Sequence, residues 1–528
     1  MTDLALFVEP MGDKGFSDIR VKEAWDSMTE GLPRAFVERM QELLGEEAGL
    51  FLASYADPPV RGLRLNGLKR DLEELERTCR AQFLLEEVPW AEEGFYVGEA
   101  YADRAEVRAG QEPEGGTGKR PGKHPYHEAG LYYLQEPSAM AAVALLGPGP
   151  GDRVLDLCAA PGGKSTQIAG RMGGQGLLVS NEIHPARAKV LSQNMERMGV
   201  SAAVVTNEDP EALADCFPLF FDKILIDAPC SGEGMFRKDP ESCKEWSPEA
   251  VALCAARQKK ILEAGVRMLR PGGLLVYSTC TFAPEEDEGS VAYLLEAHPE
   301  FTVEHRSADG FGELGMGRPE WVPKGEKKDG LEGTYRVWPH KAKGEGHYLA
   351  ALQKAGDGVL TDKKTARPPA EKARGRGASP GPGTDRQKLR ELFWPFCRET
   401  LCTRPWERQP GRYLTFGEQL YYVPADMPDM NGLKVLRPGL HLGTFKKKRF
   451  EPSHALALYL EPEQVVRRAD FPALSRETKG YLRGETLKIR EKEEGWTLVT
   501  VDGYSLGWGK ASGGTLKNHY PKGLRLQG

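Results

Sequence analysis

The chain has 528 residues, of which 40% are apolar, so it is long enough for several domains of about 150 residues, each with its own core. Its net charge of −6 gives no overall signature of nucleic-acid binding, and its nine irregularly spaced cysteines predict neither a disulfide framework nor a zinc site. We expect no signal peptide, because the first residues lack a basic stretch followed by an apolar core, and no membrane span. The sequence therefore predicts a cytoplasmic protein with reduced thiols and no metal ion.

A glycine-rich turn follows an apolar run in the middle of the chain. Residues 153–157 predict a strand, residues 158–164 read Cys-Ala-Ala-Pro-Gly-Gly-Lys, and residues 165–169 begin a helical pattern. Small residues let a ligand lie close to the backbone, and the helix N-terminus offers free amides. The turn departs from a phosphate-binding loop, because Cys158 stands where that pattern requires glycine and Pro161 lies within it. A triphosphatase is the alternative that this departure disfavours.

Acidic residues follow the next predicted strands. Glu182 ends one strand about twenty residues after the glycines, where a carboxylate is placed to accept ribose hydroxyls. Asp209 follows a strand at 203–206, and Asp227 ends a strand at 223–226. A series of carboxylates repels a polyphosphate but suits an adenosine that bears a cationic sulfonium. The sequence therefore predicts S-adenosyl-L-methionine as the cofactor.

Two cysteine motifs each follow an apolar strand, namely Ala228-Pro229-Cys230 and Ser278-Thr279-Cys280. An open α/β sheet presents its ligands at the carboxyl ends of its strands, so we expect both thiols to converge there. Carbon-5 of a pyrimidine becomes nucleophilic once a thiolate has added to carbon-6, and a second thiol can help to expel the first. The chemistry alone leaves open which cysteine attacks. For Cys158, in the glycine turn, we expect a backbone contact with the cofactor and no thiol chemistry.

These motifs resemble those of the Nop/Sun family of RNA (cytosine-5)-methyltransferases. The resemblance lies in residues 155–166, 227–234 and 272–286, and it extends to the N-terminal segment 33–69. C-terminal segments, including Leu516-Lys517-Asn518-His519-Tyr520-Pro521, resemble those of bacterial members that act on small-subunit ribosomal RNA. The match therefore covers most of the chain.

The resemblance implies roles for individual residues. Cys280 is the implied nucleophile, and Cys230 is implied in breaking the covalent intermediate. The implied cofactor contacts are Cys158, Ala159, Ala160, Pro161, Gly162, Gly163, Lys164, Glu182, Asp209 and Asp227. One departure concerns Asp209, because Pro210 follows it where the family usually has glycine, and proline fixes φ and removes an amide.

The expected fold class is α/β, with a Rossmann-like S-adenosylmethionine-dependent methyltransferase sheet. A small α/β N-terminal module precedes this sheet, and a C-terminal α+β region ends in a PUA-like β pseudobarrel. The expected divisions are an N-terminal extension (1–30), the N-terminal module with a mobile insertion (31–130), the catalytic domain (131–356), a flexible linker (357–386), an aromatic-rich subdomain (387–440) and a PUA-like RNA-binding domain (441–528).

The expected function is methylation of cytosine carbon-5 in RNA by a monomer that does not bind membranes. The resemblance points to small-subunit ribosomal RNA, naked or in an assembled subunit, and to an unpaired or flipped cytosine. The basic run Lys446-Lys447-Lys448-Arg449 either contacts phosphates or is a solvated face. Two alternatives remain open: the same chemistry on transfer RNA, and a non-catalytic RNA-binding factor for ribosome assembly.

Overall fold

The computed structural model describes residues 29–98, 120–306, 310–322, 329–356, 385–430, 432–489 and 494–526. Contacts divide the chain into two compact units, and each is described by itself. The first unit comprises residues 1–60, 228–260 and 278–350, and the second comprises residues 61–227, 261–277 and 351–528. Nearly all of the predicted extension, most of the predicted insertion and nearly all of the predicted linker lie outside the described residues.

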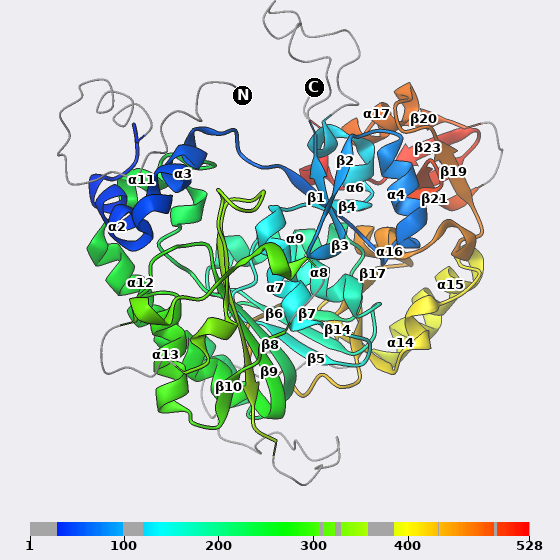
Figure 1. Cartoon of the computed structure of the whole chain (residues 1–528). Helices are drawn as coiled ribbons and strands as arrows, with labels where there is room; N and C mark the ends of the chain where they lie inside the picture. Colours follow the sequence, from blue (N-terminus) through cyan, green and yellow to red (C-terminus); the bar gives the residue numbers. More distant parts are fainter. Residues whose placement is uncertain are drawn as a thin grey trace, which may run out of the picture. The chain divides into compact units, whose positions relative to one another are not determined.

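A parallel sheet forms the centre of the second unit (Figure 1). Its strands are β5 (Arg153–Asp156), β6 (Leu177–Asn181), β7 (Ala203–Thr206) and β8 (Phe221–Asp227), in the order β8-β5-β6-β7. Nearly every residue of β5, β6 and β7 is buried, as expected for parallel strands with helices on both faces. The short strand β16 (Val435–Arg437), from the C-terminal region, adds antiparallel to β7.

Helices connect these strands as the alternating pattern in the sequence predicts. They are α8 (Gly163–Arg171), α9 (Pro185–Arg197) and α10 (Pro210–Cys216). Proline occupies the first turn of α9 and α10, where its missing N–H costs no helical hydrogen bond. The long helix α12 (Pro248–Met268) leads into β9 (Leu269–Thr279), which neighbours β8.

A four-stranded antiparallel sheet precedes the parallel one in the chain. Its order is β2-β3-β1-β4, so the first strand lies inside the sheet. Its elements are β1 (Gly62–Leu65), α4 (Leu72–Arg80), β2 (Leu85–Val88), β3 (Ala91–Val97), α6 (Pro125–Glu128) and β4 (Tyr132–Leu134). Helix α7 (Pro137–Leu146) follows and packs on β3.

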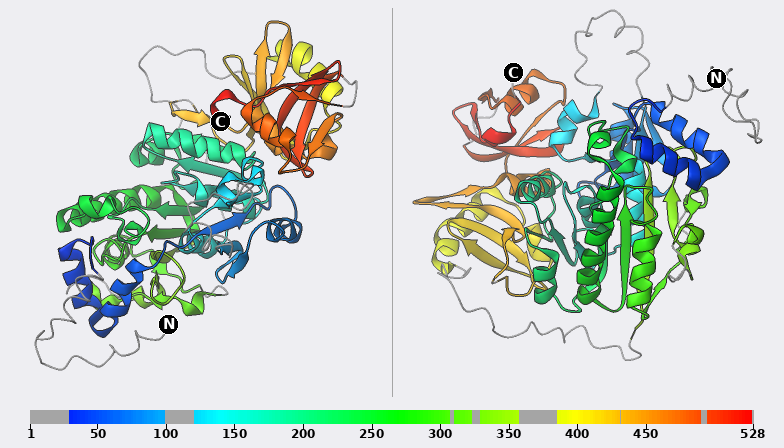
Figure 2. Two further views of the ribbon diagram at one scale, coloured as in Figure 1. Left: turned by 90° about the horizontal axis from the view of Figure 1, so that it is seen from above. Right: turned by 90° about the vertical axis from the view of Figure 1, so that its left-hand side faces the viewer.

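Two further sheets follow in the C-terminal region (orange to red in Figure 2). The first is antiparallel: β14 (Gly411–Phe416), β15 (Gln419–Pro424), β17 (Leu440–Lys446) and β18 (Arg449–Pro452). The second has the order β19-β21-β22-β23-β20, with β19 parallel to β21 and the other pairs antiparallel. Its strands are β19 (Arg468–Phe471), β20 (Leu487–Lys488), β21 (Gly495–Val501), β22 (Tyr504–Ser512) and β23 (Thr515–Asn518). Helices α15 (Trp394–Thr400), α16 (His454–Tyr459) and α17 (Arg476–Arg483) accompany these sheets.

One hydrophobic core joins the antiparallel N-terminal sheet to the last C-terminal sheet. Leu63 and Tyr132 from the former and Leu506 from the latter are fully buried in it. Tyr126 lies 6.1 Å from the Tyr504 ring, centroid to centroid. Tyr126 and Tyr504 are 378 positions apart in the sequence, so two distant parts of the chain share one apolar interior.

The first unit is built on aromatic packing. Its helices and strands include α2 (Arg34–Leu44), α3 (Ala48–Ala53), α11 (Ser242–Glu245), α13 (Glu288–Ala297), β11 (Gly315–Met316), β12 (Tyr335–Val337) and the start of β13 (His347–Lys354). Phe36 and Phe51, from α2 and α3, pack against Phe236, Phe282 and Trp338.

The predicted α/β class with a strand-rich C-terminal region is confirmed. In the part of the chain that the structure describes, none of the helices combines the length and the apolar character that a bilayer crossing requires.

Candidate active site

The glycine-rich turn lies between the end of β5 and the start of α8. Gly162 has a φ of 114°, in the left-handed region that favours glycine, and it directly precedes the first residue of α8. Beneath the turn, Ser165 Oγ donates a hydrogen bond of 2.6 Å to Asp156 Oδ2, and burial raises the pKa of Asp156 to about 7. Among the described residues, Asp156 Oδ1 is a buried oxygen without a hydrogen-bond partner.

The rest of the turn is fixed by helix α9. The Ala160 carbonyl accepts a hydrogen bond from Arg187 at 3.0 Å, and the Pro161 carbonyl accepts one from Asn194 at 2.8 Å. Ala159, Ala160 and Gly162 have little or no side chain, so the surface of the turn consists mainly of backbone, and hydrogen bonds to α9 fix that backbone. Such a surface lets a ligand approach the backbone closely.

Carboxylates surround the Cys158 thiol in this turn. Burial raises the pKa of Cys158, and the negative charges of Asp156, Asp227 and Glu182 raise it further, whereas Arg187 lowers it. Cys158 therefore stays protonated, which disfavours its thiol as a nucleophile. The negative potential suits a sulfonium cation and repels a polyphosphate, so the residues fit S-adenosylmethionine.

The predicted cofactor carboxylates differ in their surroundings. Glu182 is only 3% exposed; its Oε1 accepts the His184 N–H at 2.9 Å, and its Oε2 lies 3.4 Å from Arg187. Lys164 Nζ lies 2.6 Å from Asp227 Oδ2, so two residues predicted separately as contacts form an ion pair. Both carboxylates are thereby fixed in place by cationic or amide donors.

Asp209 has a local structural role. Its exposed carboxylate accepts the Glu211 N–H at 2.9 Å and so caps the N-terminus of α10, with Pro210 at the first helical position. Pro210 is thus compatible with the first turn of α10, and the cap engages one oxygen of the Asp209 side chain.

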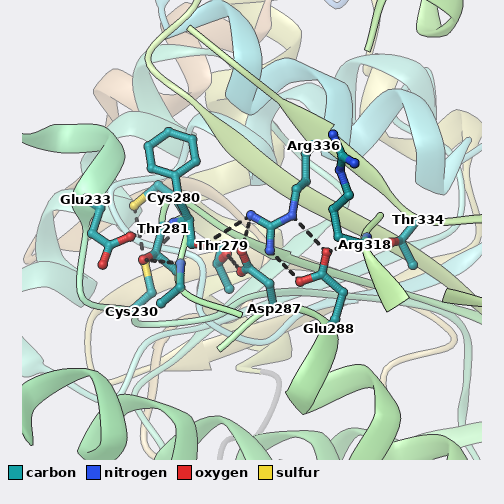
Figure 3. Close-up of polar contacts among 12 residues, drawn as sticks. Cys230, Glu233, Thr279, Cys280, Thr281, Asp287, Glu288, Arg318, Thr334 and Arg336 are labelled. Carbon is teal, nitrogen blue, oxygen red and sulfur yellow. Dashed lines mark hydrogen bonds and ion pairs between the residues drawn. The ribbon is translucent and has the colours of Figure 1, made fainter. Parts of the chain in front are cut away.

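The two predicted cysteines lie together in the first unit. Cys230 Sγ is 3.3 Å from Cys280 Sγ, and the Cys280 N–H points to Cys230 Sγ at 3.4 Å (Figure 3). The hydrogen bond with Cys280 and burial both raise the pKa of Cys230 well above its usual value. The convergence predicted from the positions of the two motifs is therefore present.

Hydrogen bonds join the two cysteine loops beyond the thiols. Ser231 Oγ and Thr281 Oγ1, the residues after each cysteine, are 2.8 Å apart. The Gly234 N–H donates to the Cys280 carbonyl at 2.9 Å, and the Phe282 N–H donates to Glu233 Oε2 at 2.9 Å. The relative position of the thiols is therefore set by both backbones.

A buried ionic cluster supports the end of β9, at Thr279, directly before Cys280, and sequence reasoning missed it. Thr279 Oγ1 donates to Asp287 Oδ1 at 2.6 Å, and Arg336 lies 3.1 Å from Asp287 Oδ2 and also pairs with Glu288 (Figure 3). All four side chains are at most 1% exposed. The only sequence signal was the acidic run that contains Asp287 and Glu288. Such a run is equally typical of a solvent-exposed face, so it does not indicate a buried cluster.

Comparison with known proteins identifies the family. The model for 16S rRNA methyltransferase RsmB/F matches residues 143–353. Models for the RsmF N-terminal domain, first C-terminal domain and PUA domain match residues 32–137, 395–460 and 469–526. Ribosomal RNA small subunit methyltransferase F of Shigella boydii is 33% identical over 511 residues, which cover 94% of this chain and 97% of that protein. The chain belongs to the RsmB/F family. The protein of the same name in Escherichia coli O9:H4 matches with the same identity and coverage.

Solved structures agree with the fold of an RsmB/F family member. A methyltransferase homolog from Pyrococcus horikoshii is 27% identical and covers 62% of this chain and 99% of its own, with a TM-score of 0.51. NSun6 from the same organism, solved with SFG, is 24% identical, covers 62% of this chain and all of its own, and has a TM-score of 0.50, which shows the shared fold.

Membership confirms the enzyme class predicted from the sequence. This RsmB/F family member is an RNA methyltransferase that uses S-adenosylmethionine, and its last sheet belongs to a PUA domain. The triphosphatase alternative is thereby excluded.

Proposed function

We propose that this enzyme methylates carbon-5 of a cytosine in small-subunit ribosomal RNA through a covalent bond to Cys280. The observation that carries this proposal is the 3.3 Å contact between the Cys230 and Cys280 thiols. A lone buried cysteine is an ordinary small apolar residue, whereas two adjacent thiols on joined loops fit a reaction that both forms and breaks a carbon–sulfur bond.

The Cys280 thiolate forms a bond to carbon-6, and the electron pair of the carbon-5–carbon-6 double bond shifts to make carbon-5 nucleophilic. S-adenosylmethionine, when bound, supplies a methyl cation equivalent from its sulfonium sulfur. Water then takes the carbon-5 proton, the double bond re-forms and the carbon–sulfur bond breaks with its electron pair on sulfur, which restores the Cys280 thiolate. We assign Cys230 to this last step, because its thiol touches the departing sulfur.

The glycine turn holds the cofactor in this proposal. Backbone and small side chains of residues 158–163 form the floor, and Glu182 accepts hydrogen bonds from the ribose hydroxyls. Lys164 and Asp227 form the edge of the same site. Asp209 is the weakest contact, because its carboxylate already caps α10.

A basic surface in the C-terminal region supports RNA as the partner. It comprises the exposed residues Lys446–Arg449 at the β17–β18 turn together with Lys510 and Lys517. Lys510 and Lys517 are direct partners across β22 and β23, an arrangement of like charges that is destabilising without a counter-ion. Burial lowers the pKa of His519, the charge of Glu451 raises it, and Lys517, Lys510 and Arg449 lower it, so these cations share one region, in which Glu451 pairs with Arg449. Phosphates of RNA are the matching counter-ions.

The proposed substrate also bears on where the enzyme acts and in what form. We propose that the enzyme acts in the cytoplasm as a monomer, without membrane contact, on small-subunit ribosomal RNA either naked or in an assembled subunit.

Covalent capture of RNA tests the chemistry. The Cys230→Ala enzyme is incubated with S-adenosylmethionine and one RNA substrate at a time: naked 16S RNA, assembled small subunits or transfer RNA. It should accumulate a denaturant-stable adduct that the double variant Cys230→Ala/Cys280→Ala lacks. Sequencing the trapped RNA identifies the cytosine. Capture by Cys280→Ala instead would reverse the two roles, and capture of transfer RNA alone would change the substrate. Bound RNA without adduct or methylation in any variant, including the wild type, would indicate a binding factor.

A further inference from the structure

The turn that carries Cys230 is held on both sides by one pair of side chains. Gln258, on α12, donates from Nε2 to the Pro229 carbonyl at 3.1 Å. Glu286 accepts the Ser231 N–H, at 3.1 Å to Oε2 and 3.3 Å to Oε1. The Gln258 amide also donates to Glu286 Oε2 at 2.7 Å. The residues immediately before and after Cys230 are thus tied to a single Gln258–Glu286 pair.

The Gln258 and Glu286 side chains are both buried, and burying polar side chains costs more free energy than burying apolar ones. Neither side chain is exposed to solvent, and a buried carboxylate is tolerated only when donors compensate for its lost hydration. Ser290 Oγ lies 3.3 Å from Gln258 Oε1 and donates to it, which directs the Gln258 amino group toward Pro229 and Glu286. Every polar atom of the pair therefore has an assigned partner, and the pair specifies one position of the turn.

The orientation of the thiols gives this position a chemical meaning. The Cys280 N–H donates to Cys230 Sγ at 3.4 Å, and either thiol can donate in the 3.3 Å contact between the two sulfur atoms. Once Cys280 is bonded to carbon-6 it has no S–H, so only the Cys230 S–H can donate across this contact. A thiol that donates to Cys280 stabilises the negative charge that develops on that sulfur when its bond to carbon-6 breaks. The charge of Glu286 also raises the pKa of Cys230, which keeps the donor protonated.

We infer that Gln258 and Glu286 are positioning residues that hold the Cys230 thiol for breakdown of the covalent adduct, and that attack by Cys280 does not depend on them. The inference rests on the proposed function. In the breakdown step, water takes the carbon-5 proton, the released electron pair forms the carbon-5–carbon-6 double bond, and the carbon–sulfur bond breaks with its pair on Cys280. The Cys230 S–H donates a hydrogen bond to that sulfur as it leaves.

Titration of Glu286 separates this role from a purely structural one. The pKa of Glu286 is raised to about 7: burial and the charge of Glu233 raise it, and the hydrogen bonds from Ser231 and Gln258 lower it. The groups that act on the Glu286 site electrostatically also include the Cys230 and Cys254 thiols and Asp287. Above about pH 7 Glu286 is a charged carboxylate and accepts a charge-assisted hydrogen bond from the Ser231 N–H. Below about pH 7 it is an uncharged acid and, like glutamine, is a weaker acceptor.

Single-turnover kinetics of Glu286→Gln test the inference, with denaturant-stable adduct followed as it appears and decays on the RNA that the wild type methylates. At about pH 8 we expect adduct appearance within about twofold of wild type and decay at least about tenfold slower, with the difference shrinking toward about pH 6. The control is Glu285→Gln, the same change in the exposed neighbouring residue, which should match wild type.

A second variant covers the case in which Glu286→Gln does not fold. Gln258→Leu removes a donor that lowers the pKa of Glu286, so decay should slow and its pH midpoint should move upward. Decay equal to wild type at every pH, or appearance slowed as much as decay, overturns the inference. Absence of methylation by the wild type would instead overturn the proposed function, which makes the two failures distinguishable.

Discussion

Arg336 neutralises two carboxylates in the interior of the first unit. It pairs with Asp287 and Glu288, and Asp287 also holds the hydroxyl of Thr279, the residue before Cys280. Removal of one partner from a buried ionic cluster leaves uncompensated charge and costs about 3–5 kcal/mol. We expect Arg336→Met to lower the free energy of unfolding by about that amount, as measured by urea denaturation.

The pH dependence of this loss follows from the pKa of Asp287, which burial raises well above its usual value. The charge of Arg336 lowers this pKa, so without Arg336 the Asp287 carboxyl must bind a proton in order to stay buried. Stability is then present below the unfolded pKa of Asp287 and is lost as pH rises through its folded pKa. The defect of Arg336→Met should therefore be larger at about pH 8 than at about pH 5. Arg318→Met, which removes an arginine that is 40% exposed, should cost less than about 1 kcal/mol at either pH. An equal loss in both variants would contradict this account.

The convergence of Cys230 and Cys280 was predictable at the residue scale, whereas the residues that hold these cysteines in place were not. Cys230 follows β8 and Cys280 follows β9. Residues at the carboxyl ends of strands in an open α/β sheet lie at the same edge of the sheet, so these two cysteines were expected to converge. Glu286, Gln258 and Arg336 act through burial, which depends on contacts far along the chain. In the sequence, the acidic residues after Pro284 look like a solvated face, so only the tertiary structure distinguishes Glu286 from Glu285.

At the scale of elements, helices α2 and α3 buttress the cysteine loops. The Phe51 ring is 5.0 Å from that of Phe282, two residues after Cys280, and Arg39 donates to Glu233, three residues after Cys230. Phe51→Ala should lower the free energy of unfolding by about 3–5 kcal/mol and reduce methylation, as measured by denaturation and methyl incorporation. Leu50→Ala is the matched control, because Leu50 is 56% exposed. Normal methylation by a destabilised Phe51→Ala enzyme would show that the buttress does not position the loops.

The alternation of apolar runs and helical patterns sufficed to predict the parallel sheet and its glycine turn. The packing of α2 and α3 on loops about 200 residues later could not be predicted in this way, because amphipathic periodicity shows which helix face is buried and not its partner.

At the scale of the whole molecule, RNA affinity should depend on the basic surface defined above. Lys447→Glu/Lys448→Glu should weaken RNA binding, and the slope of log affinity against log salt should fall by about 0.7–0.9 for each phosphate that the variant no longer neutralises. Fluorescence anisotropy with labelled ribosomal RNA over a salt series measures both. Lys189→Glu/Lys479→Glu makes the same change in net charge at exposed lysines outside that surface. An identical effect of both double variants would assign the weaker binding to net charge alone.

The core shared by the first antiparallel sheet and the last C-terminal sheet limits how this enzyme can be divided. Leu63, Tyr126 and Tyr132 are covered in part by Val499, Tyr504 and Leu506, so a chain that stopped before β19 would leave an apolar face of its N-terminal sheet in water. The last C-terminal sheet therefore cannot be removed without exposing apolar side chains of the N-terminal sheet. Within the second unit, the sheet formed by residues 62–134 and the sheet formed by residues 468–518 cover each other's apolar side chains, so neither could be replaced without changes in the other.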